Sequence, residues 1–176
     1  MHLGHLILAE EAREKLKLDK VIFVPTFMPP HKNSGDIAHP RHRYAMLKKA
    51  IQNNPFFSVS DIEIKRKGRS YTIDTIRSLK KKFPRDKIYF ITGSDLLSYL
   101  DEWKDLRAIL ALVTFVVATR PGYPLEKIPA YISTVEIRAV DISAFEIRDC
   151  IKKGISFRYL VPEPVYTYIL QKKLYR

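Results

Sequence analysis

The sequence has a single cysteine, Cys150, and no apolar run long enough to span a membrane. One cysteine excludes an internal disulfide framework and favours a reducing compartment, so we expect a cytoplasmic protein. The longest apolar stretch, about Ile109–Val117, is short and includes Thr114. The first expected helix is too rich in Glu and Lys for a signal peptide. We therefore expect no membrane partner.

Acidic residues are also scarce, with 19 Asp and Glu against 31 Lys and Arg, which gives a formal net charge of +12. This excess indicates either a basic solvated surface or an anionic partner, which could be a phosphorylated metabolite or a nucleic acid. No RNP, KH, zinc-finger or recognition-helix pattern accompanies the charge. A nucleic-acid-binding module is therefore kept only as the alternative from another class, and we expect no nucleic-acid partner.

Helical and strand patterns alternate along the 176 residues. Strands are expected at residues 21–26, 56–64, 87–93, 114–119 and 135–140. Helices are expected at residues 6–18, 41–53, 71–83, 94–112 (in two pieces around Trp103), 144–153 and 163–174. Strands separated by helices form βαβ units, which predicts an α/β fold with a parallel sheet covered on both faces. The length favours one domain, 1–176, with a small C-terminal helical part at about 142–176.

The first motif is His2-Leu3-Gly4-His5, directly before a helix. Backbone N–H groups at a helix start attract phosphate, and a glycine lets the backbone come close to a ligand. Two imidazoles beside it can donate to phosphate oxygens. Taken alone, the motif is weak evidence for a phosphate site and is more typical of a helix cap.

Further segments strengthen this interpretation, because ligands of parallel sheets bind at the carboxyl ends of the strands. His2–His5 resembles the HxGH signature of the nucleotidylyltransferase superfamily. Five more segments resemble successive blocks of bacterial nicotinate-nucleotide adenylyltransferase: FVPTFMPPHK (23–32), SYTIDT (70–75), FITGSDLLSYLDEWKD (90–105), FVVATRPGY (115–123) and ISAFEIRDCIKKGISFRYLVPEPVYTYI (142–169). The resemblance implies a Rossmann-like fold and adenylyl transfer from ATP to nicotinate mononucleotide, with Mg²⁺ accompanying ATP, in NAD biosynthesis.

The resemblance also assigns roles to single residues. The expected catalytic residues are His2, His5 and Arg148. The expected ATP-binding residues are Gly4, Lys32, Ser143 and Arg148. The expected nicotinate mononucleotide-binding residues are Thr72, Asp95, Trp103 and Arg120. Each has a plainer alternative, such as helix capping for the histidines and Asp95, core packing for Trp103, and a surface charge for Lys32, Arg120 and Arg148.

No protein-built metal site is expected. His39 and His42 are three residues apart, but no cysteine or carboxylate set joins them at ligand spacing. Magnesium is expected to arrive with ATP and to keep mostly phosphate and water ligands.

The sequence departs from the family pattern in two places. Family members usually begin earlier, with a strand and a Gly-Gly-x-Phe-Asp-Pro loop that lead into HxGH. Without that central strand, two strand edges would stay unpaired, so we expect Met1 to be an internal methionine, and an inactive truncated form is one alternative. Ala144 and Phe145 also stand where the family has Ser and Thr, which removes hydroxyl contacts to phosphates.

The acceptor is the other open point. A related enzyme acting on nicotinamide mononucleotide, on phosphopantetheine or with a cytidylyl donor is the closest alternative. Trp103 and the SYT and PPHK blocks favour a pyridine nucleotide. The choice between acid and amide depends on whether donors or acceptors face the ring substituent, and the resemblance favours nicotinate. No pattern indicates an oligomeric state.

Overall fold

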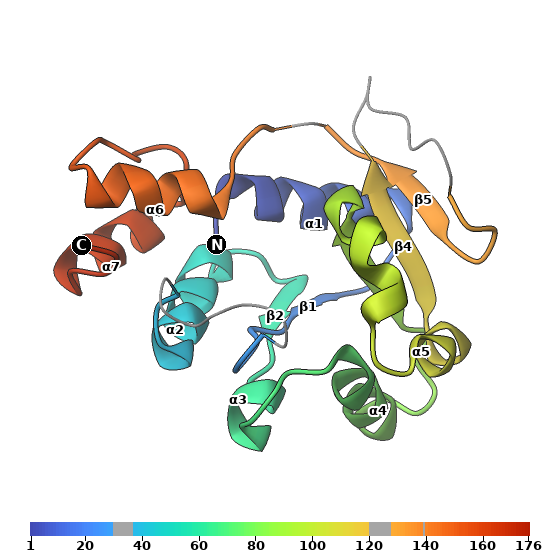
Figure 1. Cartoon of the computed structure of the whole chain (residues 1–176). Coiled ribbons are helices and arrows are strands. Elements are labelled where there is room, and N and C mark those ends of the chain that lie inside the picture. The colour runs from blue at the N-terminus through green and yellow to red at the C-terminus, as the bar shows by residue number, and fades with distance from the viewer. Residues whose placement is uncertain (30–36, 120–127, 139) are drawn as a thin grey trace.

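The computed structural model describes residues 1–29, 37–119, 128–138 and 140–176. Helices and strands alternate along most of the chain (Figure 1). In order, the elements are α1 (Leu3–Lys15), β1 (Val21–Phe23), α2 (Pro40–Ile51), β2 (Phe57–Val59), α3 (Ile62–Arg66), α4 (Thr72–Lys82), β3 (Tyr89–Gly93), the 3₁₀ helix η2 (Ser94–Glu102), α5 (Leu106–Leu112), β4 (Thr114–Thr119), β5 (Ser133–Glu136), α6 (Ala144–Lys152) and α7 (Glu163–Gln171). The expected α/β class is confirmed, and the expected break near Trp103 separates η2 from α5.

The strand pairs of the described residues are all parallel, but they form two groups rather than one sheet. β1 pairs with β2, so that Val21 lies opposite Phe57. β4 lies between β3 and β5. In the described part of the chain, β1, β2, β3 and β5 each pair with one strand only, and the expectation that a missing central strand leaves two of these edges unpaired stays a prediction.

The strand expected at 56–64 is wrong in its second half. The ladder ends when Ser60 N–H donates to the carbonyl of Phe23, because β1 offers no further partner. The chain then forms α3, which the ion pair between Lys65 and Asp61 supports at 3.0 Å. Apolar and polar residues continue to alternate through this segment, which is why a longer strand was expected. Strand pairing nevertheless stops where β1 ends, at Phe23.

β5 also ends earlier than expected. Ile137 N–H makes the last ladder bond, to Thr119, and the next backbone N–H, that of Arg138, donates to the Glu11 carboxylate at 2.9 Å. A side chain of α1 thus takes the donor that a longer strand would have used.

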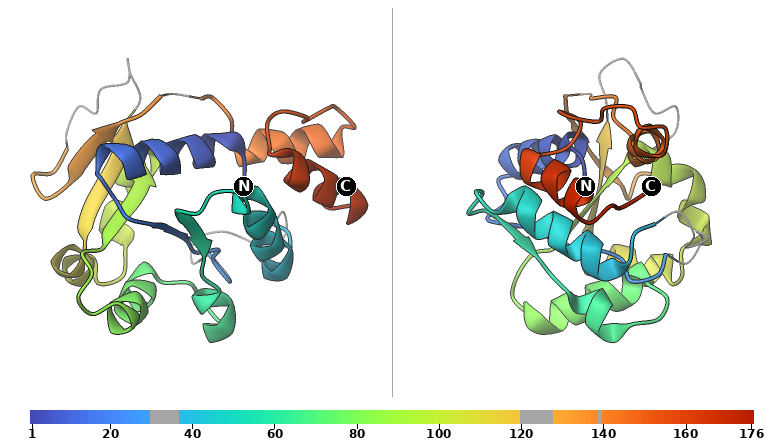
Figure 2. Two further views of the ribbon diagram at one scale, coloured as in Figure 1. Left: turned by 180° about the vertical axis from the view of Figure 1, so that it is seen from behind. Right: turned by 90° about the vertical axis from the view of Figure 1, so that its left-hand side faces the viewer.

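The residues of β4 alternate between two faces, as a strand requires. Phe115 and Val117 pack into a cluster with residues of α4 and α5. Val116 and Ala118 pack with Ala12 of α1, which is fully buried. Helices therefore cover both faces of β3–β5, with α1 on one side and α4 and α5 on the other (Figure 2).

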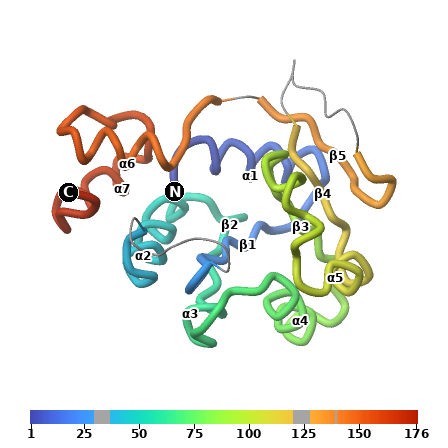
Figure 3. Tube along the Cα trace, in the orientation of Figure 1, coloured from blue at the N-terminus to red at the C-terminus, as the bar shows by residue number. Residues whose placement is uncertain are grey.

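A further cluster joins α2 to the two C-terminal helices. Met46 of α2 packs with Ile147 of α6 and Val165 of α7. These helices gather at the end of the molecule where α1 begins (Figure 3). The interpretation of 142–176 as a separate part of one domain stays a prediction. None of the helices in the described ranges is long and apolar enough to cross a membrane.

We predict that Ile73→Ala lowers the free energy of unfolding by about 2–5 kcal/mol, because Ile73 is fully buried among α4, α5 and β4. Denaturant-induced unfolding would measure the change. The matched control is Ile155→Ala, at a position 56% exposed, which should stay within about 0.5 kcal/mol of the parent. Equal losses at both positions would contradict this account of the core.

Candidate active site

The start of α1 brings the two motif histidines together. His2 is the N-cap residue and has extended backbone angles, and its own N–H donates to His5 Nδ1 at 3.5 Å. The two imidazole ring centres lie 3.8 Å apart. The first turn of α1 carries no acidic residue, so the positive end of the helix dipole is not offset there. The two histidines therefore cap α1, and the same helix start also suits a bound anion.

Gly4 allows this arrangement. A Cβ atom at Gly4 would lie 3.1 Å from His2 Nδ1 and 3.2 Å from its Cε1. Those contacts are tighter than normal packing, so a Cβ at this position would require the His2 ring to shift by a few tenths of an ångström. The glycine thus lets the imidazole pack closely over the helix start.

Both histidines are uncharged at neutral pH. Burial, together with the neighbouring imidazole and the terminal ammonium, lowers the pKa of His2 to about 3. Burial and the same ammonium lower the pKa of His5 to about 4, although the Asp95 carboxylate acts in the opposite direction. His2 Nδ1 is buried and has no hydrogen-bond partner in the described structure. A neutral imidazole with an unpartnered ring nitrogen can donate a hydrogen bond to an incoming anion and gain stability from it.

Arg148 approaches the same point from α6. It and Arg43 act on the amino group of Met1, whose pKa burial and these two charges lower to about 6. The surface-charge alternative for Arg148 would pair it with a neighbouring acid such as Glu146 or Asp149, and the structure gives both of these acids other partners. Glu146 instead accepts the Ser143 N–H at 3.2 Å, and Asp149 pairs with Lys153 at 2.7 Å.

Ser143 has a definite structural role. Its hydroxyl oxygen accepts the N–H of Glu146 at 3.1 Å, which completes a capping box at the start of α6. The hydroxyl proton is still available as a donor. Phe145, in the following turn, is 71% exposed. Its ring replaces a hydroxyl of the family pattern without joining the core.

The residues expected to bind the acceptor have mixed outcomes. Thr72 is the first residue of α4, as expected. Asp95 folds back toward Gly93 at the end of β3, so that its Oδ1 would lie 2.8 Å from a Cβ there. Trp103 packs edge-on against Phe90, with ring centres 5.5 Å apart, and belongs to the core around β4. Its stacking role stays a prediction, and the packing alternative describes its present contacts.

Lys32 and Arg120 lie outside the described residues, so their roles stay predictions. Two residues that sequence reasoning missed are Arg43 and Ser70. Arg43 donates to the carbonyls of Ala38 and Phe27, and Ser70 accepts the N–H of Phe27 at 2.8 Å. The signal that could have indicated Arg43 is its helical spacing from the buried residues Met46 and Leu47.

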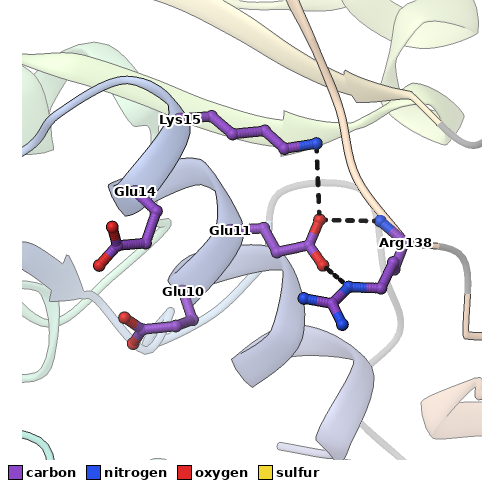
Figure 4. A pocket seen from close by; sticks show the side chains of 5 residues that line it. All are labelled: Glu10, Glu11, Glu14, Lys15 and Arg138. Atoms are coloured by element: carbon purple, nitrogen blue, oxygen red, sulfur yellow. Dashed lines mark hydrogen bonds and ion pairs between the residues drawn. The ribbon is translucent and has the colours of Figure 1, made fainter.

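An open pocket of about 320 Å³ lies at the other end of α1, away from the histidines. Charged side chains line it: Glu10, Glu11, Glu14, Lys15 and Arg138 (Figure 4). The Glu11 carboxylate accepts from both the backbone N–H and Nε of Arg138, and these bonds hold its pKa below the usual range. Glu11 thus pairs with both Lys15 and Arg138, and the contacts with Arg138 fasten α1 to the segment after β5.

Across the ranges that the structure describes, no group of three or more His, Cys, Asp or Glu side chains is placed to hold a metal ion.

Comparison with known proteins agrees with this geometry. Residues 1–149 match the cytidylyltransferase-like family. The chain is 43% identical over 187 residues to a probable nicotinate-nucleotide adenylyltransferase of Desulfitobacterium hafniense, with 100% of this chain and 90% of that protein covered. It is 43% identical over 176 residues to a protein of the same description from Thermus thermophilus, with 100% of this chain and 94% of that protein covered.

A solved structure supports the fold. Plasmodium falciparum nicotinic acid mononucleotide adenylyltransferase, complexed with APC, superposes with a TM-score of 0.77 at 17% identity and covers 99% of this chain and 91% of its own. At that identity the likeness concerns the fold alone, and it confirms the Rossmann-like architecture. Together with the sequence matches, it shows that the chain belongs to the cytidylyltransferase-like family, alongside the bacterial nicotinate-nucleotide adenylyltransferases.

Proposed function

We propose that the chain transfers the adenylyl group of ATP to nicotinate mononucleotide and releases pyrophosphate, as a step of NAD biosynthesis in the cytoplasm. The observation that carries this proposal is the pair of uncharged histidines, His2 buried and His5 exposed, at a helix start whose first turn has no acidic residue. The relatives' names supply the acceptor. The product would be nicotinate adenine dinucleotide.

The reaction needs no protein nucleophile. A phosphate oxygen of the mononucleotide attacks the α-phosphorus of ATP, and the bond to the bridging oxygen of the β-phosphate breaks. Both reactants are anions, so the protein must align them and offset their repulsion. His2, His5, Arg148 and the amides at the start of α1 are the groups that would do so, with His5 closer to the departing pyrophosphate.

Magnesium would enter with ATP. We expect the ion to be held mainly by phosphate oxygens and water. When bound, it would neutralise part of the triphosphate charge. The cationic side chains of the protein would neutralise the rest of the triphosphate charge.

The acceptor would lie between α4 and η2. The backbone N–H at Thr72 starts α4 and is suited to the nicotinate carboxylate. Asp95 would contact the ribose, since it stands at the carboxyl end of β3. The pyridine ring would stack on the face of Trp103 that its packing with Phe90 leaves accessible.

We predict that the protein forms nicotinate adenine dinucleotide as the dominant product when ATP and Mg²⁺ are supplied with nicotinate or nicotinamide mononucleotide in parallel. Backbone donors facing the ring substituent would favour the acid over the amide. Chromatography of the products is the measurement. Dominance of the amide dinucleotide would overturn the acceptor assignment. Absence of any dinucleotide, with tight and salt-sensitive RNA binding, would favour the nucleic-acid alternative.

Arg148→Gln should lower kcat/KM for ATP by about 100-fold, because it removes a positive charge and its hydrogen bonds from the developing pyrophosphate. Steady-state kinetics with varied ATP would measure this loss. Arg41→Gln makes the same change at an exposed position of α2, and its kcat/KM should stay within about twofold of the parent. A loss of equal size in Arg41→Gln would show that overall charge, rather than Arg148, matters.

Proton NMR should find that two of the five histidines titrate far below 6.5, namely His2 near 3 and His5 near 4. Their assignment would come from His2→Gln and His5→Gln. The unfolded chain binds these protons first, so the free energy of unfolding should fall as pH drops from about 6.5 toward 4. Bound ATP should raise the pKa of His5. Ordinary titration of both rings near 6.5 would refute this description of the site.

A further inference from the structure

Arg43 connects two segments that are separate in the sequence. Its Nε donates to the carbonyl of Ala38 at 3.0 Å, just before α2. Its Nη1 donates to Thr26 Oγ1 at 3.0 Å, and its Nη2 donates to the carbonyl of Phe27 at 3.1 Å. Thr26 and Phe27 follow β1, where the carboxyl end of a parallel strand faces the ligand site. One planar guanidinium therefore fixes the end of β1 against the start of α2.

The peptide groups of Phe27 are held from both sides. The carbonyl accepts from Arg43 at 3.1 Å, and the N–H donates to Ser70 Oγ at 2.8 Å. Ser70 is buried, and its own N–H donates to the carbonyl of Met28 at 2.9 Å. Ser70 lies two residues before Thr72, the first residue of α4. An unbroken series of contacts thus runs from Arg43 to the proposed acceptor site.

Arg43 is also within electrostatic reach of the proposed phosphate site. Burial is the main reason that the pKa of Arg43 lies below its ordinary value. Its charge and that of Arg148 both act on the amino group of Met1, beside His2. They also act on the hydroxyl of Tyr175, whose pKa burial raises. The guanidinium therefore acts near the start of α1 as well as on the segment after β1.

We infer that Arg43 is a positioning residue for adenylyl transfer, which holds the acceptor-binding start of α4 in line with the phosphate site at α1. This inference rests on the proposed function. Arg43 acts through Phe27 and Ser70, so the fixed planar geometry of its guanidinium group matters more than its charge. A lysine retains the charge but cannot reach three acceptors in one plane.

The test is a KM-against-kcat comparison of Arg43→Lys with the parent enzyme. The KM for nicotinate mononucleotide should rise about tenfold and kcat should fall about tenfold, since small misplacements of a substrate are costly. The KM for ATP should change less than about threefold. Arg41→Lys, the same substitution at an exposed position of α2, should leave all three constants within about twofold. Calorimetric titration with nicotinate mononucleotide should show the same loss in Arg43→Lys.

A double-mutant cycle with Ser70→Ala separates positioning from general stability. Because both side chains bond main-chain groups of Phe27, their effects on the acceptor KM should be less than additive. Additive effects, or equal rises in both KM values, would overturn the inference. If Arg43→Lys does not fold by circular dichroism, Thr26→Val removes one acceptor of the guanidinium group at nearly constant volume and should give a smaller rise of the same kind.

The outcomes distinguish the two proposals. A parent enzyme that forms the dinucleotide beside an Arg43→Lys enzyme with unchanged acceptor KM would refute the positioning role alone. A parent that forms no dinucleotide from either mononucleotide would refute the proposed function, and the positioning role with it.

Discussion

The burial of Ala12 against β4 is the contact on which the site depends. Only a small side chain lets α1 lie close to Val116 and Ala118, and the Glu11–Arg138 contacts then fix the helix along its axis. The helix start, with both histidines, is placed by what happens three turns further along. The position of His2 in the site therefore depends on how closely Ala12 packs against β4.

The electrostatics of the site follow from the immediate surroundings of its two histidines. The chain carries a net charge of +12, yet the two histidines nearest the proposed phosphate site are neutral because their surroundings disfavour charge. Neutral rings do not repel Arg148 and Arg43 before a phosphate binds. A bound polyanion would favour the protonated form of the two histidines, and the charged rings would then be stronger hydrogen-bond donors.

The sequence predicted local features well and distant contacts poorly. HxGH is a local pattern that predicts a helix start, although α1 begins at Leu3, within the motif, and not at residue 6. The alternation of β4 predicted its two faces. The strand expected at 56–64 failed because its length depends on β1, which ends at Phe23. Trp103 suited a binding role by type, but its neighbours Phe90 and Phe115 are set by the fold. Arg43 and Ser70 were missed because both bond main-chain atoms of Phe27, and the types of the residues do not indicate such contacts. Only the helical spacing of Arg43 from buried residues of α2 indicates that it points inward.

The division of the strands into two groups has a mechanical consequence. In the described residues no strand pairing joins β1–β2 to β3–β5, so a slight sliding of one group past the other would break no ladder bond. His2 and His5 belong to the helix packed on β3–β5, whereas Arg148 belongs to the helices packed with α2. A triphosphate held by both would act as a cross-link between the two halves. The rigidity of the molecule would then come partly from its own substrate.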